Sequence, residues 1–144
     1  MQLSHRLEPF AASLQNADAW LADLMEELSI QDPRQTVRVL RATLHTLRDR
    51  LAPPQAANLA AQLPLLIQAL FYEGFKPESM PERYDLEGFL NQVDRQLQPV
   101  DPDPRTAVVA VLGLLQRHVG GGILESIVGG LPADLRTFWH QALS

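Results

Sequence analysis

The chain has 144 residues, of which 46% are apolar and 20% charged, so it is long enough to bury one ordinary globular core. It contains no cysteine, which excludes disulfides, thiolate metal sites and cysteine nucleophiles and favours a reducing compartment. Its formal net charge of −5 has the wrong sign for binding nucleic acid over the whole surface.

Two amphipathic segments precede residue 30. Apolar residues in the first 15 positions (Leu3, Leu7, Phe10 and Leu14) recur at spacings of four, three and four, which favours a helix, although Pro9 limits how early that helix becomes regular. The run from Asp18 to Leu28 places apolar side chains on one helical face and carboxylates on the other. The start of the chain lacks the pattern of a signal peptide, so we expect a cytoplasmic protein.

The next helix is expected to begin at Asp32-Pro33 and to end near Leu51, before Pro53. Aspartate accepts hydrogen bonds from unpaired backbone amides at a helix start, and proline suits the first turn. An apolar seam follows the helix at spacings of three and four: Val37, Leu40, Leu44, Leu47 and Leu51. A short helix to Leu63, a break at Pro64 and a strongly apolar helix over residues 65–71 complete this half.

The second half of the chain is a degenerate copy of the first. Residues 35–64 return as residues 103–132, and residues 20–28 return as residues 89–97. The residues Leu40, Leu44, Leu47, Leu51, Leu59, Leu63 and Pro64 become Val108, Leu112, Leu115, Val119, Ile127, Leu131 and Pro132. We therefore predict an all-α protein of eight or nine helices, a single domain over residues 1–144. It consists of two tandem four-helix repeats, about 17–72 and 85–142, which share one core.

Two segments of this plan are less regular. Residues 73–84 should form an ordered loop between the repeats, because their aromatic residues suit packing onto the bundle. Residues 107–115 are rich in β-branched side chains and taken alone suit a strand equally well, but their counterpart has clear helical spacing. Being apolar on nearly every face, this helix should be central, and the helix over residues 35–51 should lie at the surface.

No residue pattern indicates a catalytic, cofactor or metal site. The glycines at 120–122 lack the Lys-Ser/Thr of a phosphate loop and read as a turn. The histidines have no metal-ligand spacing, and the acidic residues scatter over polar faces. We therefore expect a non-enzymatic interaction or regulatory module without cofactor. A small-ligand or enzymatic site between the repeats stays an alternative.

One basic stripe stands out beside the apolar seam of residues 35–51. Its members recur at spacings of four, three, four and three: Arg34, Arg38, Arg41, His45 and Arg48. The plain interpretation is that these side chains are solvated or pair with acidic residues. The sharper hypothesis is a docking face for an acidic protein partner, with nucleic acid as the weaker alternative because of the negative net charge. The apolar faces also leave a homodimer open, and no transmembrane segment is expected because the longest apolar run is too short.

Several motifs resemble a known family. They are Leu63-Pro64, Tyr72-Glu73-Gly74-Phe75-Lys76-Pro77, and Leu131-Pro132 followed by Leu135 and Trp139. Over about residues 17–140 the chain resembles the bacterial family catalogued as domain of unknown function 2267. The resemblance implies a cytoplasmic, bacterial, all-helical protein and brings no catalytic residues with it. The chain departs from the family pattern at residues 120–124, so the resemblance implies no functional role for an acidic residue in that segment.

Overall fold

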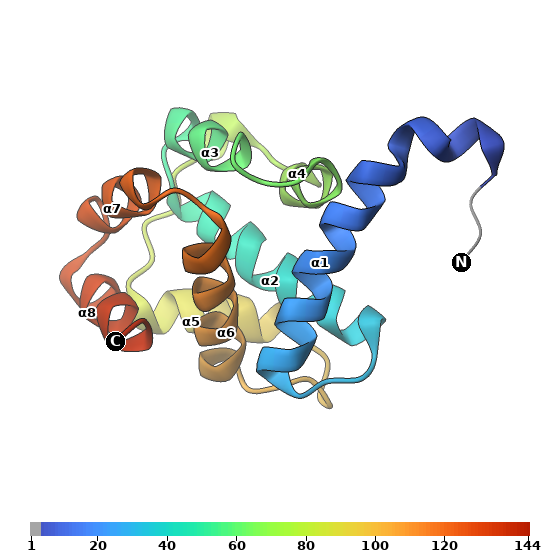
Figure 1. Ribbon diagram of the computed structural model, residues 1–144. Coiled ribbons are helices and arrows are strands. Elements are labelled where there is room, and N and C mark those ends of the chain that lie inside the picture. Colours follow the sequence, from blue (N-terminus) through green and yellow to red (C-terminus); the bar gives the residue numbers. More distant parts are fainter. Residues whose placement is uncertain (1–3) are drawn as a thin grey trace.

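The computed structural model describes residues 4–144, and every regular element in that range is a helix (Figure 1). The prediction of an all-α protein is confirmed, and residues 107–115 lie inside a helix rather than a strand. The elements are η1 (His5–Phe10), α1 (Ala11–Leu28), α2 (Pro33–Arg50), α3 (Pro53–Ala60), α4 (Leu65–Tyr72), η2 (Pro77–Ser79), α5 (Leu86–Gln96), α6 (Pro104–His118), α7 (Gly121–Gly129) and α8 (Ala133–Ala142). None of these helices is long and apolar enough to cross a membrane.

The helices begin where the sequence supplies caps. Asp32 accepts a hydrogen bond from the amide of Arg34 at 2.9 Å, and Asp103 accepts one from the amide of Thr106 at 3.0 Å. A proline follows each of these aspartates in the first turn of α2 and α6. Gly120 is the cap of α7, so the next two glycines belong to the first turn of that helix instead of a longer connecting turn.

The first turns of the chain differ in part from the expected amphipathic helix. Residues 5–10, which include Pro9, form the short 3₁₀ helix η1, and the regular α-helix begins only at Ala11. Leu3, the first apolar position of that pattern, lies outside the described residues.

Helix α2 lies at the centre of the fold together with α6. It packs against α1, α4, α5 and α6, and half of its 18 residues are buried. The expectation that it lies at the surface was therefore wrong. The reason is that Thr36, Thr43 and Thr46 are buried beside the leucine seam. The hydroxyls of Thr36 and Thr46 donate to carbonyl oxygens one turn earlier, so these polar residues pack inward.

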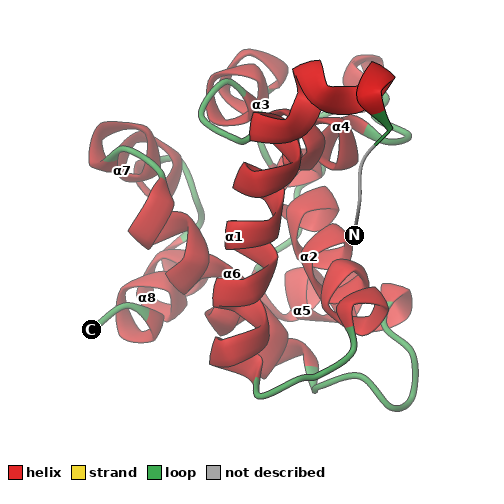
Figure 2. Cartoon of the chain, turned by 45° about the vertical axis from the view of Figure 1, so that its right-hand side comes forward, coloured by secondary structure: helices red, strands yellow, loops and turns green. Residues whose placement is uncertain are grey.

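Helices of the first half of the chain pack against helices of the second half (Figure 2). Helix α1 packs on α6 and α5 packs on α2, while α3 packs on α7. Helix α4 contacts α1 and α2, and α8 contacts α5 and α6. The buried apolar residues form one cluster to which all eight α-helices contribute, and both members of each of the six apolar pairs from Leu40/Val108 to Leu63/Leu131 are buried.

The connection between α4 and α5 is ordered by its aromatic side chains. Phe75 and Tyr84 are half-buried against the core cluster, whereas Tyr72 is more exposed. Gly74 has φ +68°, a left-handed conformation that glycine adopts without strain. The chain therefore turns at Gly74, directly after α4, and runs back along α2.

Candidate docking surface on helix α2

The basic stripe of α2 divides into two halves with different surroundings. In the carboxyl-terminal half, Arg48 is only 4% exposed. Its Nη1 donates to the carbonyl oxygens of Phe71 and Glu73 at 2.8 and 2.7 Å, and its Nε donates to Oδ1 of Asp49 at 2.7 Å. Four of its five guanidinium N–H groups thus bind within the chain, where Asp49 balances its charge.

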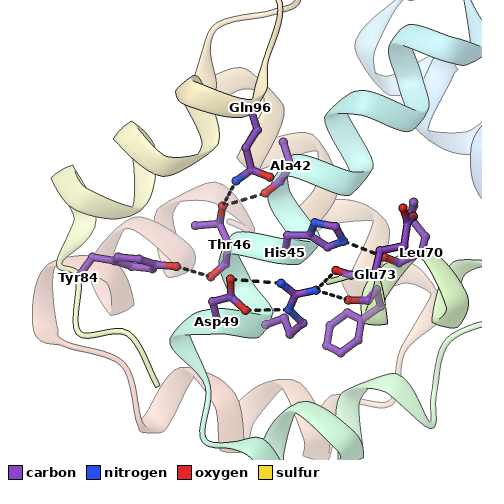
Figure 3. A network of polar contacts seen from close by, with 10 residues as sticks. Ala42, His45, Thr46, Asp49, Leu70, Glu73, Tyr84 and Gln96 are labelled. Carbon is purple, nitrogen blue, oxygen red and sulfur yellow. Dashed lines mark hydrogen bonds and ion pairs between the residues drawn. The ribbon is translucent and has the colours of Figure 1, made fainter. Parts of the chain in front are cut away.

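His45, one turn earlier, makes the same kind of contact (Figure 3). Its Nε2 lies 2.7 Å from the carbonyl oxygen of Leu70. Because a carbonyl only accepts, Nε2 must carry the proton. Burial lowers the pKa of His45, and the hydrogen bond to Leu70 opposes this effect without cancelling it. His45 is therefore the neutral Nε2–H tautomer at neutral pH.

Together, His45 and Arg48 cap the carboxyl end of α4. The carbonyl groups of Leu70, Phe71 and Glu73 belong to the last turn of α4 and its cap, where the regular helical hydrogen bonds end; the Leu70 carbonyl also accepts from the amide of Glu73 at 3.3 Å. Positive or donor groups are favoured there by the helix dipole. Phe75 packs over the Arg48 guanidinium, whose central carbon is 5.1 Å from the ring centroid.

The opposite side of α2 is joined to the second half of the chain (Figure 3). The hydroxyl of Tyr84 donates to the carbonyl of Thr46 at 3.2 Å, and Nε2 of Gln96 donates to the Thr46 hydroxyl at 3.1 Å. Burial raises the pKa of Tyr84, so its hydroxyl stays protonated and remains a donor. This network holds α2 between the connecting loop and α5.

The amino-terminal half of the stripe faces solvent. Arg34 is exposed and forms no ion pair within residues 4–144. Arg41 lies 3.6 Å from Oε1 of Glu73, with both side chains substantially exposed, so this pair is loose. Arg38 has a firmer partner, because its Nε and Nη2 each donate to a carboxylate oxygen of Asp101 at 3.2 Å.

Asp101 fixes Arg38 from the loop before α6. Its side chain is fully buried. Burial raises the pKa of this carboxyl, but hydrogen bonds from Arg38 and from the amide of Gln98 outweigh it, so the pKa of Asp101 is lowered overall. Asp101 is thus ionised and holds Arg38 in place.

A hollow of about 370 Å³ lies among these three arginines. Pro33, Arg34, Val37, Arg38 and Arg41 line it. Val37 supplies apolar lining, and Arg34 and Arg41 bring donors that suit carboxylates, whereas Nε and Nη2 of Arg38 are already bound to Asp101. This arrangement has the chemistry to dock an acidic segment that carries an apolar side chain. The sequence contains no signal for Asp101 and Glu73 as partners, because both belong to irregular segments rather than to the seam.

A second polar cluster joins α1 to α6. Asp23 accepts from Nε and Nη2 of Arg117 at 3.1 and 2.7 Å, and lies 2.8 Å from Nε2 of His118. The hydrogen bond from Arg117 lowers the pKa of Asp23 most, followed by that from His118, against a cost of burial. The Trp20 ring stacks on His118 with centroids 4.9 Å apart. Asp23, expected on a solvated face, is in fact part of this contact between the two halves.

The described residues do not gather into a metal site: in residues 4–144 no three His, Asp or Glu side chains come together in a ligand arrangement. The fold and the site define an all-helical protein with a buried arginine-centred network and an arginine-lined surface. The family described as uncharacterized conserved protein (DUF2267) matches residues 17–138, which is most of the chain, and the chain belongs to this family. A comparison with curated proteins finds no match.

Proposed function

We propose that this protein is a non-enzymatic interaction module that docks an acidic protein segment on the exposed half of the stripe. The observation that carries the proposal is the hollow among Arg34, Val37, Arg38 and Arg41, which lies outside the packed core. Arginines that line a hollow together with an apolar side chain combine charge, directional donors and contact area, as docking sites for acidic peptides do.

An acidic protein suits this surface better than nucleic acid does. The basic patch contains three arginines, and the chain around it is net negative, so a long phosphate backbone would meet repulsion outside the patch. A short acidic segment needs no more than the patch itself. A partner carboxylate can take the place of Glu73 beside Arg41, because that ion pair is long and exposed.

His45 and Arg48 are assigned a different role in this proposal. Their donors already bind the end of α4, so replacing them would alter folding together with binding. Arg38 should also stay, because its removal would leave the buried Asp101 carboxylate without its charged partner. A clean test therefore changes Arg34 and Arg41 alone.

The test compares two variants that lose the same charge. The docking variant is Arg34→Ser with Arg41→Ser, and the control is Arg83→Ser with Arg95→Ser, two exposed arginines outside the stripe. Each is immobilised beside the wild type, exposed to bacterial lysate at low and moderate salt, and the retained proteins are identified. We expect one stoichiometric acidic protein to bind the wild type and the control but not the docking variant.

Two results would contradict this proposal. Equal retention by the docking variant would remove the stripe from the interface. Retention of nucleic acid alone, lost steeply as salt rises, would favour the nucleic-acid alternative instead.

We further propose that the chain is a duplicated four-helix unit and that it acts in the bacterial cytoplasm. The packing of α1 on α6 and of α5 on α2 supports duplication, as does the burial of matched positions in both halves. The lack of cysteine supports a reducing compartment. Expression of each half alone tests the shared core: we expect neither half to fold by itself, because about 70 residues with one face uncovered are marginal.

A further inference from the structure

Each arginine of the stripe that has an ionic partner within residues 4–144 is paired with a carboxylate. The pairs are Arg38 with Asp101, Arg41 with Glu73 and Arg48 with Asp49. The pair of Arg41 is the longest of the three, at 3.6 Å, and Arg34 forms no ion pair in the described part of the chain. Arg34 and Arg41 are therefore the two arginines that can take up carboxylates of a partner.

The spacing of these two arginines defines a distance and a direction. Arg34 and Arg41 are seven residues apart on α2. At a rise of about 1.5 Å per residue they are separated by about 10.5 Å along the helix axis, and seven residues make almost two full turns. Both therefore lie on one face of α2, and Val37 lies between them, one turn from each. Along this face the order is basic, apolar, basic.

Val100 adds a second apolar side chain at the edge of the same face. It is 80% exposed in the loop between α5 and α6, and its carbonyl oxygen accepts a hydrogen bond from Nε2 of Gln35 at 3.0 Å. The next residue, Asp101, binds Arg38, which itself lines the hollow. These bonds fix the loop beside the hollow. An apolar side chain of a partner can therefore contact Val37 and Val100 together.

We propose that the acidic partner segment is an amphipathic helix with two carboxylates seven residues apart, an inference that rests on the proposed function. In a helix that lies along α2, two such carboxylates repeat both the separation and the direction of Arg34 and Arg41. An apolar residue three or four positions after the first carboxylate then faces Val37 and Val100. A β-strand matches less well, because its side chains on one face are about 7 or about 13 Å apart.

This arrangement uses charge and apolar contact for different purposes. The two carboxylate pairs fix the register of the partner helix along α2, because a shift by one turn would leave one arginine without its partner. The apolar contact in the middle supplies area that the exposed charges alone do not give. The partner is thus read as the combination of two acids and one apolar residue on a single helix face.

Binding of three fluorescent synthetic peptides to the full chain, measured by anisotropy, tests the inference. The first is a hydrocarbon-stapled helix with glutamates seven residues apart and a leucine three positions after the first glutamate. The second has the same composition and staple, but its glutamates are five residues apart and lie on different faces. The third is the first sequence without the staple and with a proline between the glutamates, which breaks the helix. We expect the first to bind at least about tenfold more tightly than the other two.

Variants of the chain show whether the first peptide occupies the hollow. Arg34→Ser with Arg41→Ser should remove its advantage over the other peptides. Val100→Asp should weaken its binding at least about fivefold, because a like charge replaces the apolar edge of the site. Leu7→Asp is the matched control and should bind like the wild type, because Leu7 is 47% exposed on η1, away from the stripe. Both single replacements are at exposed positions, so the melting temperature should not change.

Three results would overturn the inference: equal binding of the three peptides, no binding of the first peptide, or binding of the first peptide that does not depend on Arg34 and Arg41. An acidic protein captured from lysate through these two arginines would still support the proposed function in each case. The proposed function and the helical form of the partner therefore fail separately.

Discussion

Two threonines one turn apart on α2 are both buried but differ in their hydrogen bonds. The Thr46 hydroxyl donates to the carbonyl of Ala42 at 2.8 Å and accepts from Gln96 at 3.1 Å. The Thr43 hydroxyl has no hydrogen-bond partner within the described residues. A buried hydroxyl without a partner costs free energy, whereas a bonded one contributes to stability.

The two threonines should therefore respond oppositely to the same change. Thr43→Val should raise the free energy of unfolding by about 1 kcal/mol, because it removes an unsatisfied hydroxyl and keeps the shape of the side chain. Thr46→Val should lower it by about 1 kcal/mol, because Gln96 loses its acceptor. Urea denaturation of the two variants checks this, and a change of the same sign in both would contradict it.

The capping of α4 by α2 is the main feature at the scale of the elements. Arg48→Gln should lower the free energy of unfolding by about 2–4 kcal/mol, because the carbonyl groups of Phe71 and Glu73 lose a charged donor and Asp49 loses its counter-charge. Arg34→Gln, on the same helix but exposed, should leave it unchanged within error. Amide hydrogen exchange should show the loss of protection concentrated in residues 68–75.

The same cap should make stability depend on pH. Burial lowers the pKa of His45 in the folded chain below that of the unfolded chain, which is about 6.5. The folded state therefore favours neutral His45, and this contribution is present above the unfolded pKa and is lost as pH falls through the folded pKa.

Denaturation at pH 7.5 and at pH 5.5 measures this dependence. The wild type should lose more stability between these two values than His45→Gln, whose side chain retains an N–H donor but does not titrate. Equal losses in the two proteins would show that His45 does not contribute.

The fold was largely predictable because apolar periodicity and helix-breaking residues are local signals. Leu40, Leu44 and Leu47 mark one face of α2, and Pro64 and Pro132 mark where α4 and α8 begin. The central position of α2 was not predictable from that pattern, because Thr36, Thr43 and Thr46 count as polar. Their hydroxyls can bond within the helix, which makes them acceptable in a core.

The candidate site was predictable as a list of basic residues but not as a surface. The spacing of Arg34 to Arg48 places five side chains along α2 correctly, yet their partners come from remote segments. The carbonyls that bind His45 and Arg48 follow some 25 residues later, and Asp101 lies 63 positions beyond Arg38. No local pattern reports such contacts, so burial of one half of the stripe emerges only from the folded chain.

For the whole molecule, the central claim is that the exposed half of the stripe docks an acidic partner while the buried half holds the fold. The most direct measurement is a calorimetric titration of the partner captured from lysate into the wild type and into Arg34→Ser with Arg41→Ser. We predict that the variant binds at least about tenfold more weakly, with an unchanged melting temperature, whereas Arg83→Ser with Arg95→Ser binds like the wild type. Equal affinity for all three proteins would contradict the account.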